Sequence, residues 1–299
     1  MTEQSASPQK IVIIGGVAGG MSVATRLRRI NETAEIVVIE RGGAVSFANC
    51  GLPYHVGGVI ENRSSLVLQK PEQLKARFNI DVLLRTEATA INRDARSVSV
   101  TDLETGASSE ISYDALVLSP GSTPFRPPIA GVETAHVLWN LDDMDALMDT
   151  ASRATSAVVV GGGFIGLELA ENLIHRGITT TLVEALPQLM ATLDSEMAWP
   201  LVERARFQGL DVRLSAQVTA ITDSGVTLGD GSTIEADFTV VAVGARPNTE
   251  LAVGAGLEMG EAGGVTVDEH QRTSDPTVWT GGDVAEKIRP DGHSLVPTA

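Results

Sequence analysis

Short apolar runs rich in β-branched residues alternate along the chain with segments in which apolar residues recur every three or four positions. The first run, Ile11–Ile14, is followed by glycines and then by Met21, Ala24, Leu27 and Ile30. A continuous apolar run is typical of a parallel strand buried on both faces, and the wider spacing predicts an amphipathic helix. The pattern therefore predicts an α/β fold of three layers with mostly parallel sheets.

The segment KIVIIGGVAGGMSVATRLRRI, residues 10–30, and the strand EIVVIE after it have the order strand, glycine turn, helix, strand, acid. This order binds the adenosine diphosphate half of a dinucleotide. The glycines let the backbone approach a pyrophosphate, and the helix N-terminus offers unpaired N–H groups. Gly15 and Gly20 fit the outer glycines of the fingerprint, whereas Val17 stands at the middle position. Glu40 is expected to accept hydrogen bonds from ribose hydroxyls.

The same order recurs in AVVVGGGFIGLELAENLIHRGITTTLVE, residues 157–184, where Gly161, Gly163 and Gly166 fit the fingerprint fully and Glu184 is the acid. The distance from first glycine to acid is 25 residues in the first copy and 23 in the second, close to the expected spacing of about 20. One copy alone could be a structural turn, but two copies predict an internal repeat and two different dinucleotides. Such a protein moves electrons between them, so we expect a flavin and a nicotinamide.

The segment TVWTGGDVAE, residues 277–286, helps to decide which site holds which dinucleotide. It resembles the second flavin motif of flavoproteins with two dinucleotide sites, in which the aspartate, here Asp283, bonds the ribityl chain. Asp283 could also be the N-cap of a following helix. The motif assigns FAD to the first site and the nicotinamide to the second. Glu184 is followed by ALPQ, without an arginine or lysine for a 2′-phosphate, so NADH is favoured over NADPH.

Two Gly/Pro-rich segments divide the chain. DALVLSPGSTPFRPPIAG, residues 114–131, indicates an exit from the first domain, and TVVAVGARPNTE, residues 239–250, indicates the return. We predict an FAD-binding domain formed by residues 1–120 and 247–299, with an NAD(H)-binding domain of residues 121–246 inserted in it.

Composition excludes several classes of protein. With 43% apolar and 20% charged residues the chain is typical of a globular protein, and a net charge of −16 argues against nucleic acid or an anionic membrane as a partner. No apolar run approaches the length of about 18 residues that a spanning helix needs, and the N-terminus has no signal-peptide pattern. The single cysteine excludes an internal disulfide and a cysteine-rich metal site. We therefore expect a cytoplasmic protein.

Both fingerprints together with the motifs LSPG, VGARPNT, GGDVA and SFANCGLPY, residues 46–54, resemble the single-cysteine pyridine nucleotide–disulfide oxidoreductases. The cysteine motif is most similar to the coenzyme A disulfide reductases and the NADH-dependent persulfide or polysulfide reductases. The resemblance implies a homodimer, with a flavin-covering helix and a dimerisation domain after GGDVAE, and in many persulfide reductases a rhodanese domain. Because this chain ends at Ala299, we interpret it as truncated, without the dimerisation domain.

Cys50 in that motif is the candidate catalytic residue. The alternative is a small buried apolar residue. The segment GLPYHVGG after it can begin a short helix, whose dipole would lower the thiol pKa. With no second cysteine, the partner sulfur must come from a small-molecule disulfide or persulfide. A mixed disulfide with a low-molecular-weight thiol such as coenzyme A would then be reduced and formed again by exchange.

Coenzyme A carries several phosphate charges, so an acidic protein needs a local basic cluster to bind it. The candidates on the first helix and after the cysteine loop are Arg26, Arg28, Arg29, Arg63, Lys70, Lys75 and Arg77. The alternative for each is a solvated helix face. The resemblance matches Arg29, Ser46 and Asn49 to coenzyme A-binding positions.

The resemblance implies further cofactor-binding residues. In the first site these are Ala18, Arg41, Asn49, Ala88, Ser119 and Gly121, and in the second they are Phe164, Ile165, Glu168 and Gly244. Phe164 matches an aromatic gate over the flavin, or else packs in the core. Glu168 matches a glutamate near the nicotinamide, or else is an acid favoured by the helix dipole. His55 could assist proton transfer, or else be a surface imidazole.

Two other functions stay open. One is an NADH oxidase or peroxidase that holds Cys50 as sulfenic acid. Those relatives carry a histidine in the first glycine turn, where Ala18 stands here, which argues against them. The other is an inactive nucleotide-binding fragment.

Overall fold

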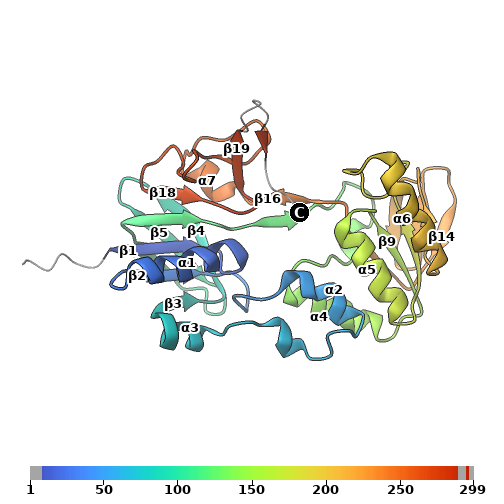
Figure 1. Ribbon diagram of the computed structural model, residues 1–299, viewed down its shortest axis with the longest axis horizontal. Coiled ribbons are helices and arrows are strands. Elements are labelled where there is room, and N and C mark those ends of the chain that lie inside the picture. The colour runs from blue at the N-terminus through green and yellow to red at the C-terminus, as the bar shows by residue number, and fades with distance from the viewer. Residues whose placement is uncertain (1–8, 289–293, 296–299) are drawn as a thin grey trace, which may run out of the picture. The chain divides into compact units, whose positions relative to one another are not determined.

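The computed structural model describes residues 9–288 and 294–295. The chain forms two compact units, and segments from early and late in the chain, blue and red in Figure 1, meet in the first unit. The first unit holds the described residues of Met1–Phe47, Val67–Ser122 and Pro247–Thr298, and the second holds Ala48–Leu66 and Thr123–Arg246. The N-terminal segment 1–8, where the sequence shows no signal-peptide pattern, and Ala299, where we interpret the chain as truncated, lie outside the described residues.

Residues 48–66 belong to the second unit, whereas the sequence placed them in the first domain. In this segment a 3-10 turn, η1 (Asn49–Gly51), leads into the short helix α2 (Leu52–Val56). Helix α2 packs against α4 (Leu141–Ala151) and α5 (Phe164–His175). The segment therefore groups with its packing partners and not with its neighbours in sequence.

A five-stranded parallel sheet forms the centre of the first unit. Its strands in spatial order are β18 (Val278–Thr280), β7 (Ala115–Leu118), β1 (Lys10–Ile14), β2 (Glu35–Ile39) and β3 (Ile80–Leu83). All carboxyl ends share one edge. The chain order reverses beside β1, and ligands of such sheets bind at this switch point.

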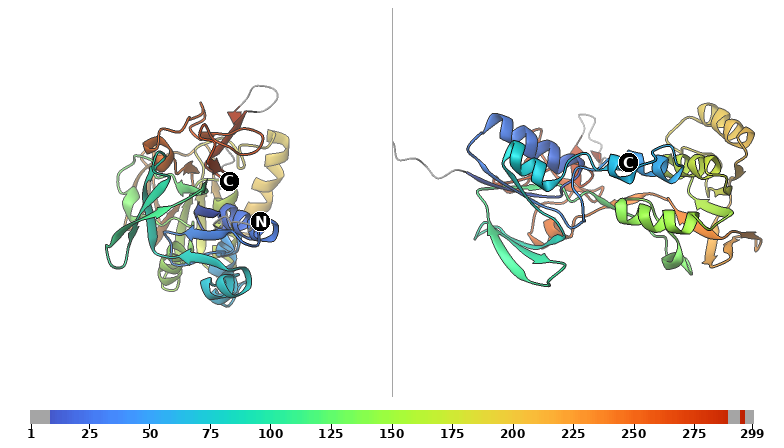
Figure 2. Two further views of the ribbon diagram at one scale, coloured as in Figure 1. Left: turned by 90° about the vertical axis from the view of Figure 1, so that its left-hand side faces the viewer. Right: turned by 90° about the horizontal axis from the view of Figure 1, so that it is seen from below.

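Both faces of this sheet are covered, which explains its continuous apolar runs. Ile11 of β1 packs against α1 (Ala18–Ile30) and α3 (Pro71–Phe78), whereas its neighbour Val12 packs on the opposite face. An antiparallel sheet lies on that opposite face, away from the two helices in the right panel of Figure 2. Its strands are β4 (Thr86–Asn92), β5 (Ser97–Asp102) and β6 (Ser108–Ser112).

Shorter elements complete the described part of the first unit. They are α7 (Glu250–Gly254), β17 (Val265–Thr266), β19 (Ala285–Ile288) and β20 (Ser294–Leu295). The two connecting strands between the units, β8 (Ser122–Pro124) and β16 (Ala245–Pro247), pair with each other. Among the residues that the structure describes, no helix is both long and apolar enough to cross a membrane.

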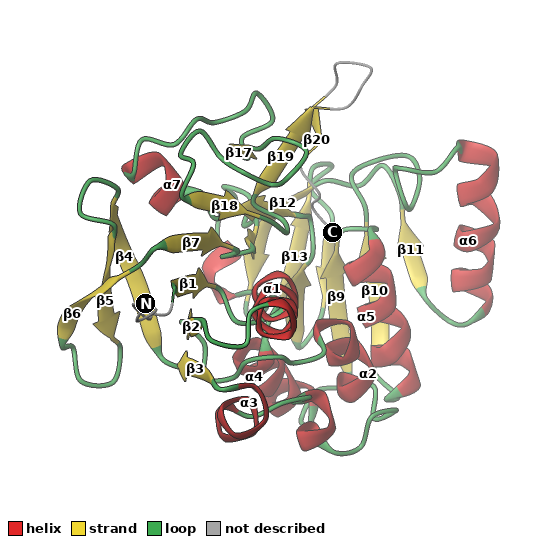
Figure 3. Cartoon of the chain, turned by 60° about the vertical axis from the view of Figure 1, so that its left-hand side comes forward, coloured by secondary structure: helices red, strands yellow, loops and turns green. Residues whose placement is uncertain are grey.

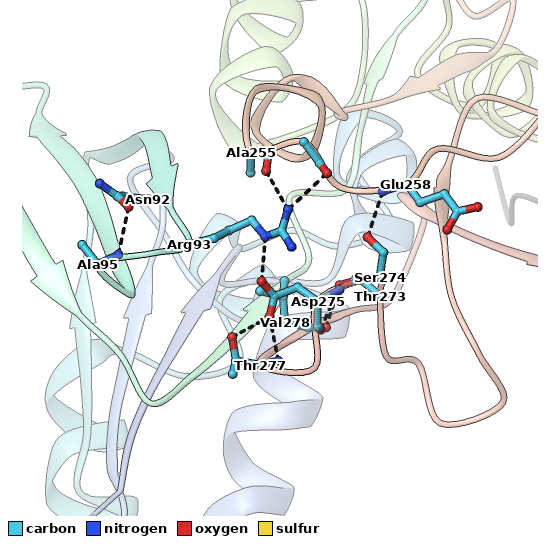
Figure 4. A network of polar contacts seen from close by, with 11 residues as sticks. Asn92, Arg93, Ala95, Ala255, Glu258, Thr273, Ser274, Asp275, Thr277 and Val278 are labelled. Carbon is cyan, nitrogen blue, oxygen red and sulfur yellow. Dashed lines mark hydrogen bonds and ion pairs between the residues drawn. The ribbon is translucent and has the colours of Figure 1, made fainter.

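Arg93, directly after β4, holds three segments of the first unit together (Figure 4). Its Nε donates to Oδ2 of Asp275 at 2.6 Å, and its Nη1 donates to the carbonyl oxygens of Ala255 and Gly256 at 3.3 and 3.2 Å. Burial raises the pKa of Asp275, but hydrogen bonds from Arg93 and Thr277 outweigh burial and hold that pKa below its ordinary value. This network joins the antiparallel sheet to the end of α7 and to the turn before β18.

The second unit repeats the arrangement of the first. Its parallel sheet has the spatial order β11 (Asp211–Arg213), β10 (Thr179–Val183), β9 (Ser156–Val160) and β15 (Phe238–Val241). The β9–β10 pair aligns five residues with five, as the β1–β2 pair does. The prediction of an internal repeat of mostly parallel α/β domains is therefore confirmed.

The sheet of the second unit is also covered on both faces. Val158 and Val160 pack against a second antiparallel sheet. Helix α5 lies over the other face (Figure 3), and α6 (Ser195–Phe207) packs against β11. The strands of that sheet are β12 (Val218–Thr222), β13 (Gly225–Leu228) and β14 (Thr233–Glu235). Two 3-10 turns, η2 (Arg63–Leu66) and η3 (Val132–Thr134), complete the described elements of this unit.

Candidate functional site

The first glycine turn connects β1 to α1 at the carboxyl edge of the parallel sheet. Gly15 has a φ of +102°, and a Cβ there would collide with the carbonyl oxygen of Ser119. A Cβ at Gly20 would collide with the carbonyl oxygen of Gly15. Only glycine fits these two positions without a shift of the backbone. Val17, at the middle position, is the N-cap residue of α1.

Glu40 closes this turn from the end of β2. Its Oε2 accepts a hydrogen bond from the N–H of Gly16 at 2.7 Å, and its Oε1 accepts one from the N–H of Gly42 at 2.6 Å. Each carboxylate oxygen retains a lone pair, so ribose hydroxyls could still donate to it. We call Gly15, Gly16, Gly20 and Glu40 the first cradle.

The start of α1 fits a pyrophosphate. In the described chain no side chain caps the helix, and its first turn contains no acidic residue. The N–H groups of that turn therefore have no side-chain acceptor, and they lie at the positive end of the helix dipole. Such a helix start is a ready-made phosphate site, and the first cradle could hold the diphosphate of FAD.

The second cradle, formed by Gly161, Gly162, Gly166 and Glu184, has the same construction. Gly161 has a φ of +113°, and a Cβ at Gly166 would collide with its carbonyl oxygen. Oε2 of Glu184 accepts from the N–H of Gly162 at 2.6 Å, and Oε1 accepts from the N–H of Leu186 at 2.8 Å. Helix α5, which begins after Gly163, also has no side-chain cap among the described residues.

Asp283 lies at the same sheet edge as the first cradle. The hydroxyl of Ser122 donates to Oδ2 of Asp283 at 2.7 Å, and the hydroxyl of Ser119 donates to the carbonyl oxygen of Gly281 at 3.1 Å. The N-cap alternative for Asp283 is wrong, because β19 and not a helix follows from Ala285. The second oxygen of the carboxylate has no protein donor in the described hydrogen-bond network and could accept a ligand hydroxyl.

Cys50 is exposed within the 3-10 turn before α2, so the alternative of a buried apolar residue is wrong. The end of the following helix is held by α5. Nδ1 of His175 donates to the carbonyl oxygen of Gly57 at 2.9 Å, and Nη1 of Arg176 donates to that of Val56 at 2.9 Å. The thiol is therefore presented on an anchored segment of the second unit.

A cavity of about 700 Å³ opens beside the first glycine turn, entirely within the first unit. Its lining contains both polar and apolar side chains. Arg29 of α1, Arg77 of α3 and Ser46 are polar, and Phe47 and Leu68 are apolar. The structure thus brings together two of the predicted coenzyme A-binding residues, Arg29 and Ser46. The third, Asn49, lies beside Cys50 in the second unit.

Three members of the predicted basic cluster have structural partners. Arg28 is buried and bonded to backbone carbonyl oxygens. Arg63 makes a two-pronged ion pair with Asp145 at 2.7 Å, and Lys75 pairs with Asp81 at 2.8 Å. A count of positive residues cannot reveal which charges already have partners in the fold.

His55 is buried, with 8% of its surface exposed, and its Nδ1 bonds to the carbonyl oxygen of Ile60 at 2.6 Å. The alternative of a surface imidazole is wrong. The hydrogen bond closes the turn after α2, so His55 stabilises the segment that presents Cys50.

The other predicted cofactor residues lie in varied positions. Arg41 is exposed, and its Nη1 lies 3.6 Å from Oε1 of Glu87. Glu87 directly precedes Ala88 in β4 of the antiparallel sheet. Phe164 is 62% exposed at the start of α5, so the alternative of core packing is wrong. The remaining residues lie at helix starts or in turns. Ala18 begins α1, and Ile165 and Glu168 follow Phe164 in α5. Gly121 and Gly244 have positive φ values of +69° and +113°.

The sequence did not reveal that Ser122, His175 and Arg176 hold functional segments in place. Ser122 is 5% exposed and orients Asp283. A histidine and an arginine at the end of a helix are ordinary C-terminal residues, and only the fold brings them to α2. The resemblance offered no signal for Ser122.

Comparisons with known proteins agree with this geometry. The family described as "Pyridine nucleotide-disulphide oxidoreductase" matches residues 9–299. A protein of Staphylococcus aureus (strain JH9) named coenzyme A disulfide reductase is 32% identical over 280 residues, which are 92% of this chain and 63% of that protein. The chain thus spans less than two thirds of this relative.

Two solved structures are also similar. The crystal structure of reduced Bacillus anthracis CoADR-RHD is 40% identical, with a TM-score of 0.94 over 97% of this chain and 54% of that one. The structure of a NAD-dependent persulfide reductase from A. fulgidus is 36% identical, with a TM-score of 0.92 over 96% of this chain and 56% of that one.

Proposed function

The chain belongs to the pyridine nucleotide-disulphide oxidoreductase family, and from this premise we propose that it transfers electrons from NADH through FAD to Cys50. The substrate is coenzyme A disulfide or a coenzyme A persulfide or polysulfide. The observation that carries the proposal is the pair of matching cradles, each with a carboxylate bonded to two backbone N–H groups, in a chain with one exposed thiol.

The first cradle binds FAD and the second binds NADH. Asp283 supports this assignment, because it lies at the edge of the first sheet, held by Ser122, where a ribityl chain could donate to it. When bound, FAD supplies two-electron transfer between NADH and sulfur. Glu184 supports NADH over NADPH, since its carboxylate would repel a 2′-phosphate, and residues 185–190 contain no cation.

Cys50 performs the sulfur chemistry. Its thiolate attacks one sulfur of the substrate disulfide, a mixed disulfide forms at Cys50, and one thiolate leaves. Reduction of this mixed disulfide by two electrons releases the second thiol and restores the Cys50 thiolate. With a persulfide substrate, the sulfur transferred to Cys50 leaves as sulfide. Exposure of Cys50 on an anchored turn supports attack on an external sulfur.

Coenzyme A binds with its phosphates at the cavity of the first unit. Arg29 and Arg77 supply positive charge there, and Phe47 and Leu68 supply apolar surface for the pantetheine arm. We also propose that the whole protein is a cytoplasmic homodimer. This proposal rests on the family resemblance carried by the motif SFANCGLPY.

Intact mass of the protein isolated without reductant, before and after treatment with a thiol reductant, tests the proposal. We expect a reductant-sensitive adduct of coenzyme A mass, absent from a Cys50→Ser variant. NADH-dependent release of thiol from coenzyme A disulfide by the FAD-loaded chain should follow, and Cys50→Ser should abolish it.

Other outcomes would overturn parts of the proposal. An oxygen adduct on Cys50, with turnover of peroxide, would favour the oxidase and peroxidase chemistry instead. A bare thiol and no turnover, with NADH still bound, would indicate a nucleotide-binding fragment without activity.

A further inference from the structure

Arg28 lies in the last turn of α1, with its side chain directed into the protein. Only 9% of the residue is exposed. Its hydrogen-bond partners among the described residues are all backbone carbonyl oxygens, although carboxylates are the usual partners of a buried arginine. Because the guanidinium of Arg28 bonds only to backbone carbonyl oxygens, we assign it a structural role.

The guanidinium of Arg28 uses all five of its N–H donors. Its acceptors are the carbonyl oxygens of Phe78 (2.6 Å), Asn31 (3.1 Å), Glu32 (2.7 Å), Ala34 (2.6 Å) and Asn79 (3.0 Å). A guanidinium has five donors fixed in one plane, whereas a lysine ammonium has three. No other side chain can therefore make the same set of bonds.

These acceptors come from two segments about fifty positions apart. Three follow the end of α1, and two, Phe78 and Asn79, lie at the end of α3. The positive charge is also favourable at the negative ends of both helix dipoles. Arg28 therefore fastens the C-terminal end of α1 to that of α3.

The residues next to these contacts line the cavity of the first unit. Arg29 follows Arg28 on α1, and Arg77 precedes Phe78 on α3. Both side chains are exposed, and among the ion pairs of the described residues neither has a carboxylate partner. The guanidinium of Arg77 lies 5.0 Å from the centre of the Phe78 ring, which restricts its position.

We propose that Arg28 is a positioning residue that fixes Arg29 and Arg77 as a pair for binding the phosphates of coenzyme A. The inference rests on the proposed function for the identity of the ligand. Two guanidinium groups on separate helices can bind one anion together only if the helices keep their spacing. Arg28 sets this spacing by bonding both helix ends.

The test compares Kd values for coenzyme A and for pantetheine, which has no phosphate, measured by calorimetry in the presence of reductant. Arg28→Lys keeps the charge but loses at least two bonds. We expect it to weaken coenzyme A binding about tenfold and to leave pantetheine binding unchanged. Arg26→Lys is the matched control, since Arg26 is exposed on the same helix and does not line the cavity.

A double-mutant cycle separates positioning from general damage. In a chain that carries Arg29→Gln and Arg77→Gln, Arg28→Lys should have no further effect on coenzyme A binding. The inference would be overturned if Arg28→Lys weakened pantetheine binding as much as coenzyme A binding. It would also be overturned if Arg28→Lys still weakened coenzyme A binding in the chain that carries Arg29→Gln and Arg77→Gln. Either result would leave the proposed function standing. If the wild-type chain does not bind coenzyme A, the proposed substrate is wrong and the inference falls with it.

A second pair of variants serves if Arg28→Lys does not fold. Asn79 has a φ of +49°, so Asn79→Ala strains the turn that presents two of the acceptors, whereas Asn79→Gly does not. We expect Asn79→Ala to weaken coenzyme A binding and Asn79→Gly to leave it unchanged. Equal affinities for the two variants would refute the positioning role.

Discussion

Replacing Glu184 by glutamine should change the choice between NADH and NADPH. The carboxylate accepts the N–H of Gly162 through one oxygen and the N–H of Leu186 through the other. Glutamine has a single acceptor oxygen, so its NH₂ group must face one of these N–H groups. The unpaired donor costs about 1 to 3 kcal/mol of local stability, and the negative charge is lost.

The negative charge of Glu184 determines the preference between NADH and NADPH. Two unit negative charges about 5 Å apart repel by about 1 to 3 kcal/mol for dielectric constants between about 80 and 20. NADPH binding to Glu184→Gln should therefore improve relative to NADH binding by about tenfold, within a range of about 5- to 160-fold. NADH binding itself should weaken, because a ribose hydroxyl loses a charged acceptor.

Titration calorimetry with NADH and NADPH gives both Kd values and hence their ratio. Glu40→Gln is the matched control, because Glu40 makes the same two backbone bonds in the first cradle. We expect Glu40→Gln to leave the ratio unchanged. A ratio that does not move in Glu184→Gln, or that moves equally in both variants, would refute the reasoning.

Three further predictions concern stability, measured by urea unfolding. Burial lowers the pKa of His136 below its ordinary value, so the unfolded chain binds the proton more readily. The stability present above about pH 6.5 should fall as the pH drops toward the lower folded pKa, and His136→Gln should reduce this slope. Gly15→Ala should cost about 2 to 4 kcal/mol, because it combines a φ of +102° with a collision at the Ser119 carbonyl; a cost near zero would contradict the turn geometry. Arg63→Gln should cost about 1 kcal/mol or less, because both side chains of the Arg63–Asp145 pair are 46% exposed, and the difference should shrink in high salt.

Much of the fold could be predicted from local pattern. Apolar runs such as Ile11–Ile14 predicted buried parallel strands, and the positions of Gly15 and Gly161 predicted the turns after them. These signals are local, because a buried strand and a left-handed backbone each restrict the residue types within a few positions of the sequence. The acids at Glu40 and Glu184 were found in the same way, from their spacing to the glycines.

The candidate site was only partly predictable. The sequence identified Cys50 but could not determine whether it is exposed. The resemblance singled out Arg29, but charge alone did not distinguish Arg28 from Arg77. The structure separates them, with Arg28 bonded to five carbonyl oxygens and the other two at a cavity.

The sequence by itself determined the order of strands, glycine turns, helices and acids, and hence the two cradles. Tertiary structure alone decided that residues 48–66 pack with the second unit, that Ser122 orients Asp283, and which arginine is buried. The physical reason is distance along the chain. Arg28 and Phe78, like Ser122 and Asp283, are joined by single hydrogen bonds across 50 and 161 positions. Such a contact follows no periodicity, and it exists only once the sheets have assembled.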